Sequence, residues 1–332
     1  MPPSSSNALT LARNAMATRF EIVLPGDDSV KLRAAGEEAL DEIERIEAAL
    51  SFHRPTSEIA HINARASREP VRVSPEVFAL LQLSAALALE TGGAFDITIA
   101  PLLRCWGFIG GSGRLPDPSE INEARARVGM HHVHLDAESF TVRFDTDGVM
   151  IDLGSIGKGY ALDQAARVLK DSGTNRALLH GGTSTVVAIG QPDDREPWKI
   201  AVDPPPDSAQ ASTLPLAVIP LRDEALSVSA VWGKSFQSGD RRFGHVLDPR
   251  TGQPAARAEL AAVALPEAMV TDALSTALLI DGVAGLDPLI ARRPAARALV
   301  VGSPQSSATR PLHSRGIEIQ NSQCQPALRQ GR

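Results

Sequence analysis

The sequence predicts an α+β fold built from mixed, largely antiparallel sheets with flanking helices. Its predicted strands follow one another in adjacent runs and do not alternate strictly with helices, which argues against a doubly wound parallel sheet. Two pairs of neighbouring strands are typical of hairpins, one within His131–Phe144 and one formed by Arg297–Val301 and Leu312–Gln320. We find no internal repeat, so a repeat architecture is not indicated.

Periodicity and capping residues predict the remaining elements in chain order. Alternating residues, or short apolar runs between turn residues, predict strands at Arg19–Leu24, Ala177–Gly190, Trp198–Val202, Leu214–Pro220 and Phe243–Leu247. Apolar spacing of three and four predicts helices at Ser29–Leu50, at about Pro75–Thr91, at about Tyr160–Lys170 and from Thr271 onward. Ser74 as N-cap and Gly92 after the last turn bound the second of these helices. Asp203–Ser212 is predicted to be a loop because prolines and small polar residues fill it.

The composition is that of a soluble globular chain. Of the 332 residues, 43% are hydrophobic and 22% are charged, which suits one large domain or two ordinary ones. The net charge of −6 gives no support to nucleic-acid binding, and no window reaches the roughly 18 continuous apolar residues of a membrane span. Cys105 and Cys324 are too few for a disulfide framework, so a reducing compartment is expected.

Both ends of the chain are predicted to be loose. Residues 1–15 open with a Pro- and Ser-rich stretch, and residues 321–332 are expected to fray. The first residues show no export signal. The chain as given is therefore expected to be cytoplasmic, or periplasmic if its N-terminus was trimmed.

The helix from Thr271 contains the most informative segment, Asp272–Ile280. Its residues leave almost no polar face, so burial is expected, yet Asp272 and Thr276 lie four apart on one side. A buried carboxylate is costly unless its charge is compensated, and a hard divalent cation with oxygen ligands is one way to do so. Alternatively, Asp272 lies in the first turn, where it favours the helix dipole and meets water. The segment alone leaves both interpretations open.

A glycine-rich turn at Ile151–Tyr160 lies between a strand and a helix. In that geometry backbone N–H groups can approach a phosphate closely. The turn is not a Walker A loop, because Asp152 stands where the first glycine is required and Gly159 where Ser or Thr is required. A plain tight turn with a solvated Lys158 is the alternative interpretation.

Three further segments contain residues that suit a binding site. His245, within Gly244–Gly252, can serve as a general base or phosphate donor, or as a structural group of its strand. Thr91–Pro101 combines flexible backbone with a carboxylate and aromatic rings, which suits the wall of a flat-ring site or a helix end followed by core packing. His180–Thr185 is a second glycine-rich break in a strand.

Taken in order, these segments resemble the ApbE family of flavin transferases. The matching stretches are Met16–Thr18, Ser51–Asn63, Gly92–Phe108, Ile151–Asp163, His180–Gly190, His245–Gly252 and Asp272–Thr276. The resemblance implies a single ApbE-like domain over residues 16–320, with two lobes around a flavin cleft. It also implies the family's reaction, in which FAD and Mg²⁺ are used to attach FMN, through a phosphoester, to a threonine or serine of an acceptor protein.

The resemblance implies roles for individual residues of this chain. The metal would be held by the side chains of Asp272 and Thr276 and by backbone carbonyl oxygens of Gly157 and Ser275. FAD would be surrounded by Met16, Phe52, Ala94, Phe95, Asp96, Ser155, Lys158 and His245. Asp272 and His245 would be the catalytic residues, with His245 as the base that takes the proton of the acceptor hydroxyl.

The sequence departs from the family pattern at several positions. His53 stands where members commonly have tyrosine, Thr183 replaces the aspartate of a Gly-Gly-Asp motif, and Val228 and Ala230 replace residues of a Thr-Ser-Gly stretch. Members are typically exported lipoproteins, whereas no lipid-attachment cysteine lies near Met1. Three alternatives stay open: a metal-dependent FAD pyrophosphatase that gives FMN and AMP, a non-catalytic flavin-binding protein, and a flavin oxidoreductase.

Overall fold

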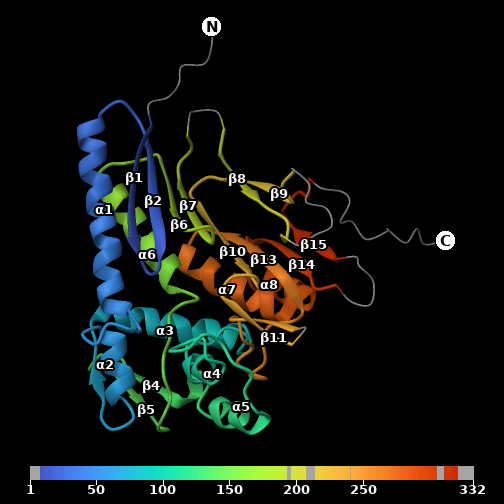
Figure 1. Ribbon diagram of the computed structural model, residues 1–332. Coiled ribbons are helices and arrows are strands. Elements are labelled where there is room, and N and C mark those ends of the chain that lie inside the picture. Colours follow the sequence, from blue (N-terminus) through green and yellow to red (C-terminus); the bar gives the residue numbers. More distant parts are fainter. Residues whose placement is uncertain (1–7, 193–195, 207–213, 240, 305–309, 321–332) are drawn as a thin grey trace, which may run out of the picture.

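An eight-stranded antiparallel sheet forms the centre of the upper lobe (Figure 1). The computed structural model describes residues 8–192, 196–206, 214–239, 241–304 and 310–320. In spatial order the strands are β1 (Ala8–Ala15), β2 (Thr18–Pro25), β6 (Ala177–Gly181), β7 (Thr185–Ile189), β10 (Glu224–Ala230), β13 (Ala258–Leu265), β14 (Arg297–Gly302) and β15 (Leu312–Arg315). Each neighbouring pair is antiparallel, so the predicted fold class is confirmed.

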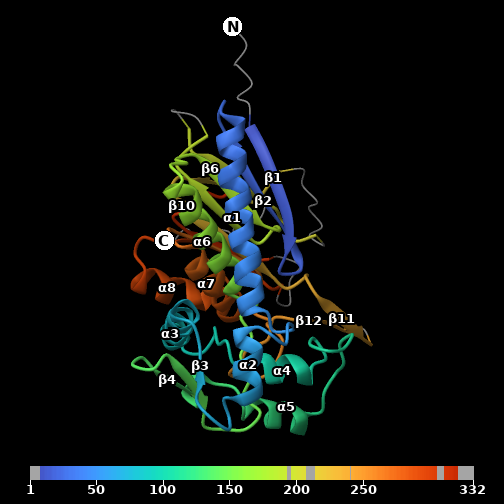
Figure 2. The same ribbon diagram turned by 90° about the vertical axis from the view of Figure 1, so that its left-hand side faces the viewer.

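Three helices cover one face of this sheet and enclose most of the apolar core. They are α1 (Ser29–Leu50), α6 (Gly157–Asp171) and α7 (Ala268–Asp281). Helix α1 packs on α6, α6 packs on α7, and α7 packs on β10 and β13. Figure 2 shows this layer from the side of α1. The opposite face is covered by the hairpin of β8 (Trp198–Val202) and β9 (Ala217–Leu221), which encloses a second apolar cluster.

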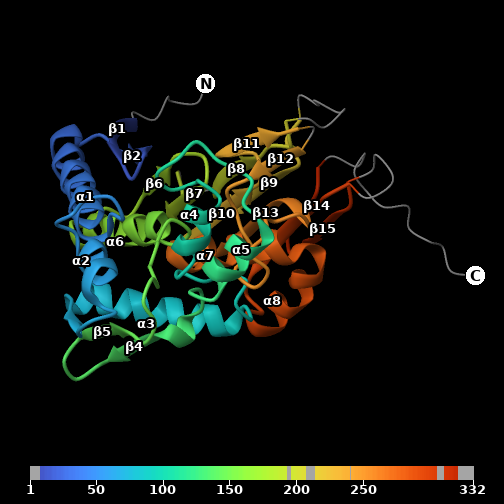
Figure 3. The ribbon, with the colours of Figure 1, turned by 60° about the horizontal axis from the view of Figure 1, so that its bottom comes forward.

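The lower lobe is formed mainly by the elements between α1 and α6 (Figure 3). They are α2 (Glu58–Arg65), β3 (Val71–Arg72), α3 (Pro75–Glu90), α4 (Ala100–Cys105), α5 (Pro118–Arg125), η1 (Met130–His132), β4 (Val133–Asp136) and β5 (Thr141–Phe144). The hairpin of β11 (Ser235–Ser238) and β12 (Arg241–Gly244) extends down to this lobe, where Phe236 and Phe243 contact Trp106. After α7, the chain forms η2 (Gly282–Gly285) and α8 (Leu286–Arg292).

Elements with strong local signals are confirmed. Helix α1 has the predicted bounds, and α3 begins after Ser74, whose side chain accepts a hydrogen bond from the N–H of Val77 at 3.3 Å. The hairpin predicted within His131–Phe144 is formed by β4 and β5, and the late hairpin by β14 and β15.

The predicted loose N-terminus is wrong for the residues that the structure describes there. Ala8–Ala15 form β1 and pair along their whole length with β2, because alternating Leu and Ala side chains bury Leu11 and Ala15 against α1. Residues 1–7 and the predicted frayed tail, residues 321–332, lie outside the described residues.

Several other predicted boundaries are corrected. The strand predicted over Ala177–Gly190 is the hairpin of β6 and β7, which turns at Gly182 with φ +62°. Helix α6 already begins at Gly157, and α7 at Ala268. Strand β12 ends at Gly244, so His245 lies just beyond a strand and not on it. Part of the predicted loop at 203–212 lies outside the described residues.

One apolar stretch, Ala268–Arg292, is long and apolar enough to cross a membrane by length and composition. It comprises α7, η2 and α8, and more than half of its most apolar window, 56%, is buried inside the protein. Because α7 packs between α6 and the sheet, this stretch forms part of the core.

Candidate active site

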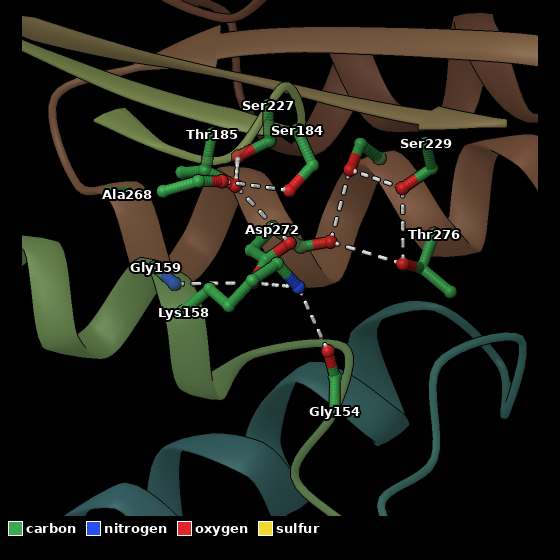
Figure 4. A network of polar contacts seen from close by, with 12 residues as sticks. Gly154, Lys158, Gly159, Ser184, Thr185, Ser227, Ser229, Ala268, Asp272 and Thr276 are labelled. Atoms are coloured by element: carbon green, nitrogen blue, oxygen red, sulfur yellow. Dashed lines mark hydrogen bonds and ion pairs between the residues drawn. The ribbon is translucent and has the colours of Figure 1, made fainter. Parts of the chain in front are cut away.

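Helix α7 brings a buried carboxylate to the wall of a cleft. Asp272 keeps only 4% of its surface exposed, and it lies beyond the first turn because α7 begins at Ala268. The alternative of a solvated first-turn aspartate is therefore wrong. Its Oδ2 accepts the N–H of Gly159 at 3.1 Å and lies 3.8 Å from Nζ of Lys158 (Figure 4). Oδ1 accepts a long hydrogen bond, 3.5 Å, from the hydroxyl of Thr185 and so keeps lone pairs for a further ligand.

Buried hydroxyl groups join α7 to strand β10 beside this carboxylate. Oγ of Ser229 lies 2.8 Å from Oγ of Ser275 and 3.2 Å from Oγ1 of Thr276. The hydroxyls of Ser275 and Thr276 also donate to the backbone carbonyl of Asp272, at 3.0 and 3.2 Å. Oγ of Ser227 lies 2.8 Å from Oγ1 of Thr271, which adds a further hydrogen bond between β10 and α7. Neutral oxygens therefore surround one side of Asp272.

The glycine-rich turn before α6 acts differently from the expected phosphate loop. The N–H of Gly154 donates to Oδ1 of Asp152 at 2.8 Å, and the N–H of Gly157 donates to the carbonyl of Leu153 at 2.7 Å. Since Gly159 donates to Asp272, the N–H groups of all three glycines have acceptors inside the chain. Nζ of Lys158 instead carries the positive charge of this turn, and it also donates to the carbonyl of Gly154 at 3.2 Å.

The cleft has a volume of about 1200 Å³ and is lined by residues of both lobes. The predicted site residues that line it are Met16, Ala94, Phe95, Asp96, Ser155, Lys158, His245, Asp272 and Thr276. The structure therefore brings together residues from the β1–β2 turn, the segment between α3 and α4, the start of α6, the segment after β12, and α7. Gly157 and Ser275 are buried next to lining residues and do not line the cleft themselves.

Asp96 is held rigidly at the lower wall of the cleft. Its Oδ1 accepts the N–H and the hydroxyl of Thr98 at 2.8 and 2.6 Å, and its Oδ2 accepts the N–H of Met130 at 3.1 Å. Burial raises the pKa of Asp96, and the hydrogen bonds from Thr98 and Met130 oppose that rise. This carboxylate therefore shapes the Ala94–Asp96 turn through internal hydrogen bonds.

His245 presents one free ring nitrogen to the cleft. Nδ1 lies 3.0 Å from the carbonyl of Lys234, and because a carbonyl only accepts, Nδ1 carries the proton and Nε2 is the basic nitrogen. Burial lowers the pKa of His245, and the ammonium groups of Lys158 and Lys234 lower it further, against the opposing effect of the Lys234 hydrogen bond. The neutral imidazole that results is the form required of a general base.

Comparison with known proteins assigns the chain to a family. The family model described as ApbE matches residues 16–300, most of the chain. The chain belongs to the ApbE family. A relative from Klebsiella pneumoniae (strain 342) is 30% identical over 84% of this chain and 80% of its own length, and one from Escherichia coli (strain K12) is 26% identical with the same coverage. Both relatives are named FAD:protein FMN transferase.

Solved structures of ApbE proteins share the fold. The ApbE protein of Thermotoga maritima MSB8 superposes with a TM-score of 0.80 and 31% identity, covering 89% of this chain and 94% of that chain. The flavin transferase ApbE from Vibrio cholerae gives a TM-score of 0.80 and 26% identity over 94% of this chain and 98% of its own. The predicted ApbE-like fold is thereby confirmed.

Three of the four positions at which this ApbE family member departs from the family pattern lie at the cleft. Thr183, Val228 and Ala230 all line it. His53 is exposed, and its ring meets Phe52 edge-on with centroids 5.3 Å apart. Phe52 does not line the cleft; the guanidinium of Arg104 lies over its ring at 5.6 Å. The predicted contact of Phe52 with FAD stays a prediction.

Several polar residues at this ApbE site were not among the predicted ones. Asp152 lines the cleft, and burial raises the pKa of its carboxyl. Ser184 and Ser229 also line it, and Thr185 contacts Asp272. Asp152 lies within the glycine-rich turn that the sequence had already indicated. Ser184 and Thr185 lie within the glycine-rich break His180–Thr185 that the sequence had also indicated, whereas Ser229 lies on β10 and no local pattern relates it to Asp272.

Proposed function

We propose that this protein transfers FMN from FAD to a threonine or serine hydroxyl of an acceptor protein, with Mg²⁺ bound beside Asp272 and with release of AMP. Family membership and the activity named for relatives at 30% and 26% identity support the reaction. The observation that carries the proposal is the pair of Asp272 and Lys158, 3.8 Å apart, at the wall of a cleft of about 1200 Å³.

The atoms around Asp272 fit a hard divalent cation. Asp272 and Thr276 line the cleft, and the carbonyl oxygens of Gly157 and Ser275 are the further predicted donors. All of these are oxygen ligands, which Mg²⁺ prefers. Within the described ranges no group of three or more His, Cys, Asp or Glu side chains is placed to hold a metal, so oxygens of the substrate would complete the coordination. Mg²⁺ bound there would offset the charge of the FAD diphosphate.

The side chains of the cleft have separate tasks in the transfer. Nε2 of His245 takes the proton of the acceptor hydroxyl as the new oxygen–phosphorus bond forms to FMN. The bond between that phosphorus and the oxygen of AMP breaks at the same time, and AMP leaves. The ammonium of Lys158 lies at the same wall, where it offsets the negative charge of the diphosphate and of the departing AMP. Such a transfer depends on positioning and charge stabilisation more than on covalent catalysis.

The transfer is tested by intact mass spectrometry. The protein is incubated with FAD, Mg²⁺ and an acceptor domain that contains a flavinylation site, and the acceptor should gain one FMN minus water. Asp272→Asn, which keeps the size of the side chain and removes its charge, should abolish this adduct. Release of FMN and AMP without any acceptor would favour the pyrophosphatase instead. Absence of both products under every metal condition would refute the proposal.

A further inference from the structure

Helix α7 begins without a cap of its own. Glu267, at the N-cap position, makes no side-chain hydrogen bond to the first turn. The first N–H groups of α7 donate instead to Asp163 of α6: Ala268 to Oδ1 at 2.8 Å and Met269 to Oδ2 at 2.9 Å. One carboxylate thus satisfies two of the N–H groups that a helix start leaves without partners. Its negative charge also interacts favourably with the positive end of the helix dipole.

Helix α6 therefore holds α7 at two points, one turn apart on each helix. At the first point the carboxylate of Asp163 binds the N–H groups of Ala268 and Met269. At the second, the N–H of Gly159 binds Oδ2 of Asp272. Two such contacts fix the rotation of α7 and its position along its axis relative to α6 more firmly than one contact does. Asp163 does not line the cleft.

We propose that Asp163 is a positioning residue of the transferase site, which fixes the first turn of α7 so that Asp272 and Thr276 face the cleft in the geometry that binds Mg²⁺ and FAD. This inference rests on the function proposed above. Loss of the carboxylate leaves the fold of α7 largely intact, because the sheet and α6 bury the helix, but it releases the helix start. The expected effect is therefore on ligand affinity more than on the rate at saturation.

The test compares Asp163→Ala and Asp163→Asn with wild type. FAD dissociation constants are measured by flavin fluorescence over a Mg²⁺ series without acceptor. The Mg²⁺ concentration that half-saturates binding should rise about tenfold for Asp163→Ala, which corresponds to about 1.4 kcal/mol. Asp163→Asn, which keeps one acceptor oxygen, should give a smaller rise. At saturating Mg²⁺ and FAD, kcat should change less than threefold, an order-of-magnitude expectation for a positioning effect.

Hydrogen exchange and a matched control separate this role from a general loss of stability. Amides of Ala268 and Met269 should exchange faster in both Asp163 variants. Asp28→Ala removes a comparable cap, that of α1, whose Oδ1 accepts the N–H of Lys31 at 3.0 Å, and should change neither exchange in α7 nor the Mg²⁺ requirement.

Unchanged Mg²⁺ half-saturation in both folded Asp163 variants would overturn the positioning role. If wild type itself binds FAD without regard to Mg²⁺ and forms no adduct, the proposed function fails. Hydrogen exchange of the Ala268 and Met269 amides in the Asp163 variants would then still show whether Asp163 holds the start of α7.

Discussion

Gly159→Ala is expected to separate the two helices that build the site. A Cβ at residue 159 would meet the backbone of Ala268 and Met269, with the Ala268 carbonyl carbon at 2.6 Å and Cα of Met269 at 2.7 Å. Because these atoms, and the Ala268 carbonyl oxygen that lies closer still, belong to the backbone, α7 must move by at least about 0.8 Å to bring the carbonyl carbon to an ordinary contact of 3.4 Å. The hydrogen bond from residue 159 to Oδ2 of Asp272, now 3.1 Å, would lengthen beyond hydrogen-bonding range.

The change in the free energy of unfolding combines two destabilising effects and one stabilising effect. Overpacking costs about 1–3 kcal/mol, and the weakened hydrogen bond to a charged group costs about 1.5–3 kcal/mol. Replacing glycine by alanine in a helix returns about 1 kcal/mol. The net destabilisation of about 3 kcal/mol should lower the melting temperature by roughly 4 °C, because an unfolding entropy of about 2.1 cal/mol/K per residue gives about 0.7 kcal/mol/K for 332 residues. Because Asp272 is displaced, FMN transfer should fall at least about tenfold.

Gly157→Ala is the matched control on the same helix. A Cβ there has Leu153 Cβ as its nearest neighbour at 3.8 Å, which is an ordinary contact, and the backbone carbonyl predicted to bind the metal is retained. Its melting temperature should equal that of wild type or exceed it slightly, with FMN transfer unchanged. Thermal unfolding and the rate of adduct formation are measured for both variants. Equal losses in Gly157→Ala and Gly159→Ala would refute the close-approach reasoning.

Three further predictions concern the groups around the cleft. Because burial lowers the pKa of His245, kcat/KM should stay high until the pH falls below the ordinary pKa of histidine. His245→Gln should remove this fall in kcat/KM at acid pH, together with most of the rate. A fall that persists in the variant would exclude His245 as the base. Ser229→Ala removes the hydroxyl that contacts Ser275 and Thr276, so urea unfolding should show a loss of about 1 kcal/mol, and an unchanged midpoint would contradict the contact. Burial raises the pKa of Asp163 to about 6, so the folded state takes up this proton before the unfolded state does. The free energy of unfolding of wild type relative to Asp163→Asn should therefore rise as the pH falls through about 6, and a flat difference would show that the carboxyl titrates normally.

Amphipathic spacing and capping residues correctly predicted helices that bury one face. The amphipathic spacing of Ser29–Leu50 places one face against the sheet, and the Ser74–Pro75 start of α3 follows from capping chemistry within a few residues. These features require no knowledge of the rest of the chain, because the partner atoms lie within one turn.

The central strands of the sheet could not be predicted in the same way. Strand β13 (Ala258–Leu265) is buried on both faces and rich in alanine, so it shows no alternation of apolar and polar residues and equally suits a helix. Strand β10 (Glu224–Ala230) was missed for a related reason, since its serines lie on the side that hydrogen-bonds α7 and so hide the strand's apolar pattern. Both strands are defined by neighbours far away in sequence.

Only part of the site was predicted, because some of its contacts also join residues far apart in sequence. The family resemblance supplied nine of the residues that line the cleft, whereas the apolar segment around Asp272 left both a buried and a solvated carboxylate open. Thr185 and Ser229 contact Asp272 or its helix only because β7 and β10 cross beside α7. One N–H group of the glycine-rich turn, that of Gly159, is likewise occupied by Asp272, a residue more than 100 positions away.

Compensation of the Asp272 charge by the chain itself determines how strongly the proposed metal would contribute to stability. The ammonium of Lys158 and the N–H of Gly159 both lie at Oδ2, so this carboxylate has its counter-charge before any cation arrives. A metal that a fold requires contributes its binding energy to folding, whereas a cation that joins a compensated carboxylate adds little to stability. Removal of divalent metal by EDTA should thus abolish FMN transfer, and addition of Mg²⁺ should restore it. The melting temperature without FAD should change by less than about 2 °C on chelation. A large fall in the melting temperature on chelation would mean that Lys158 does not neutralise Asp272 and that the cation holds α7 in place.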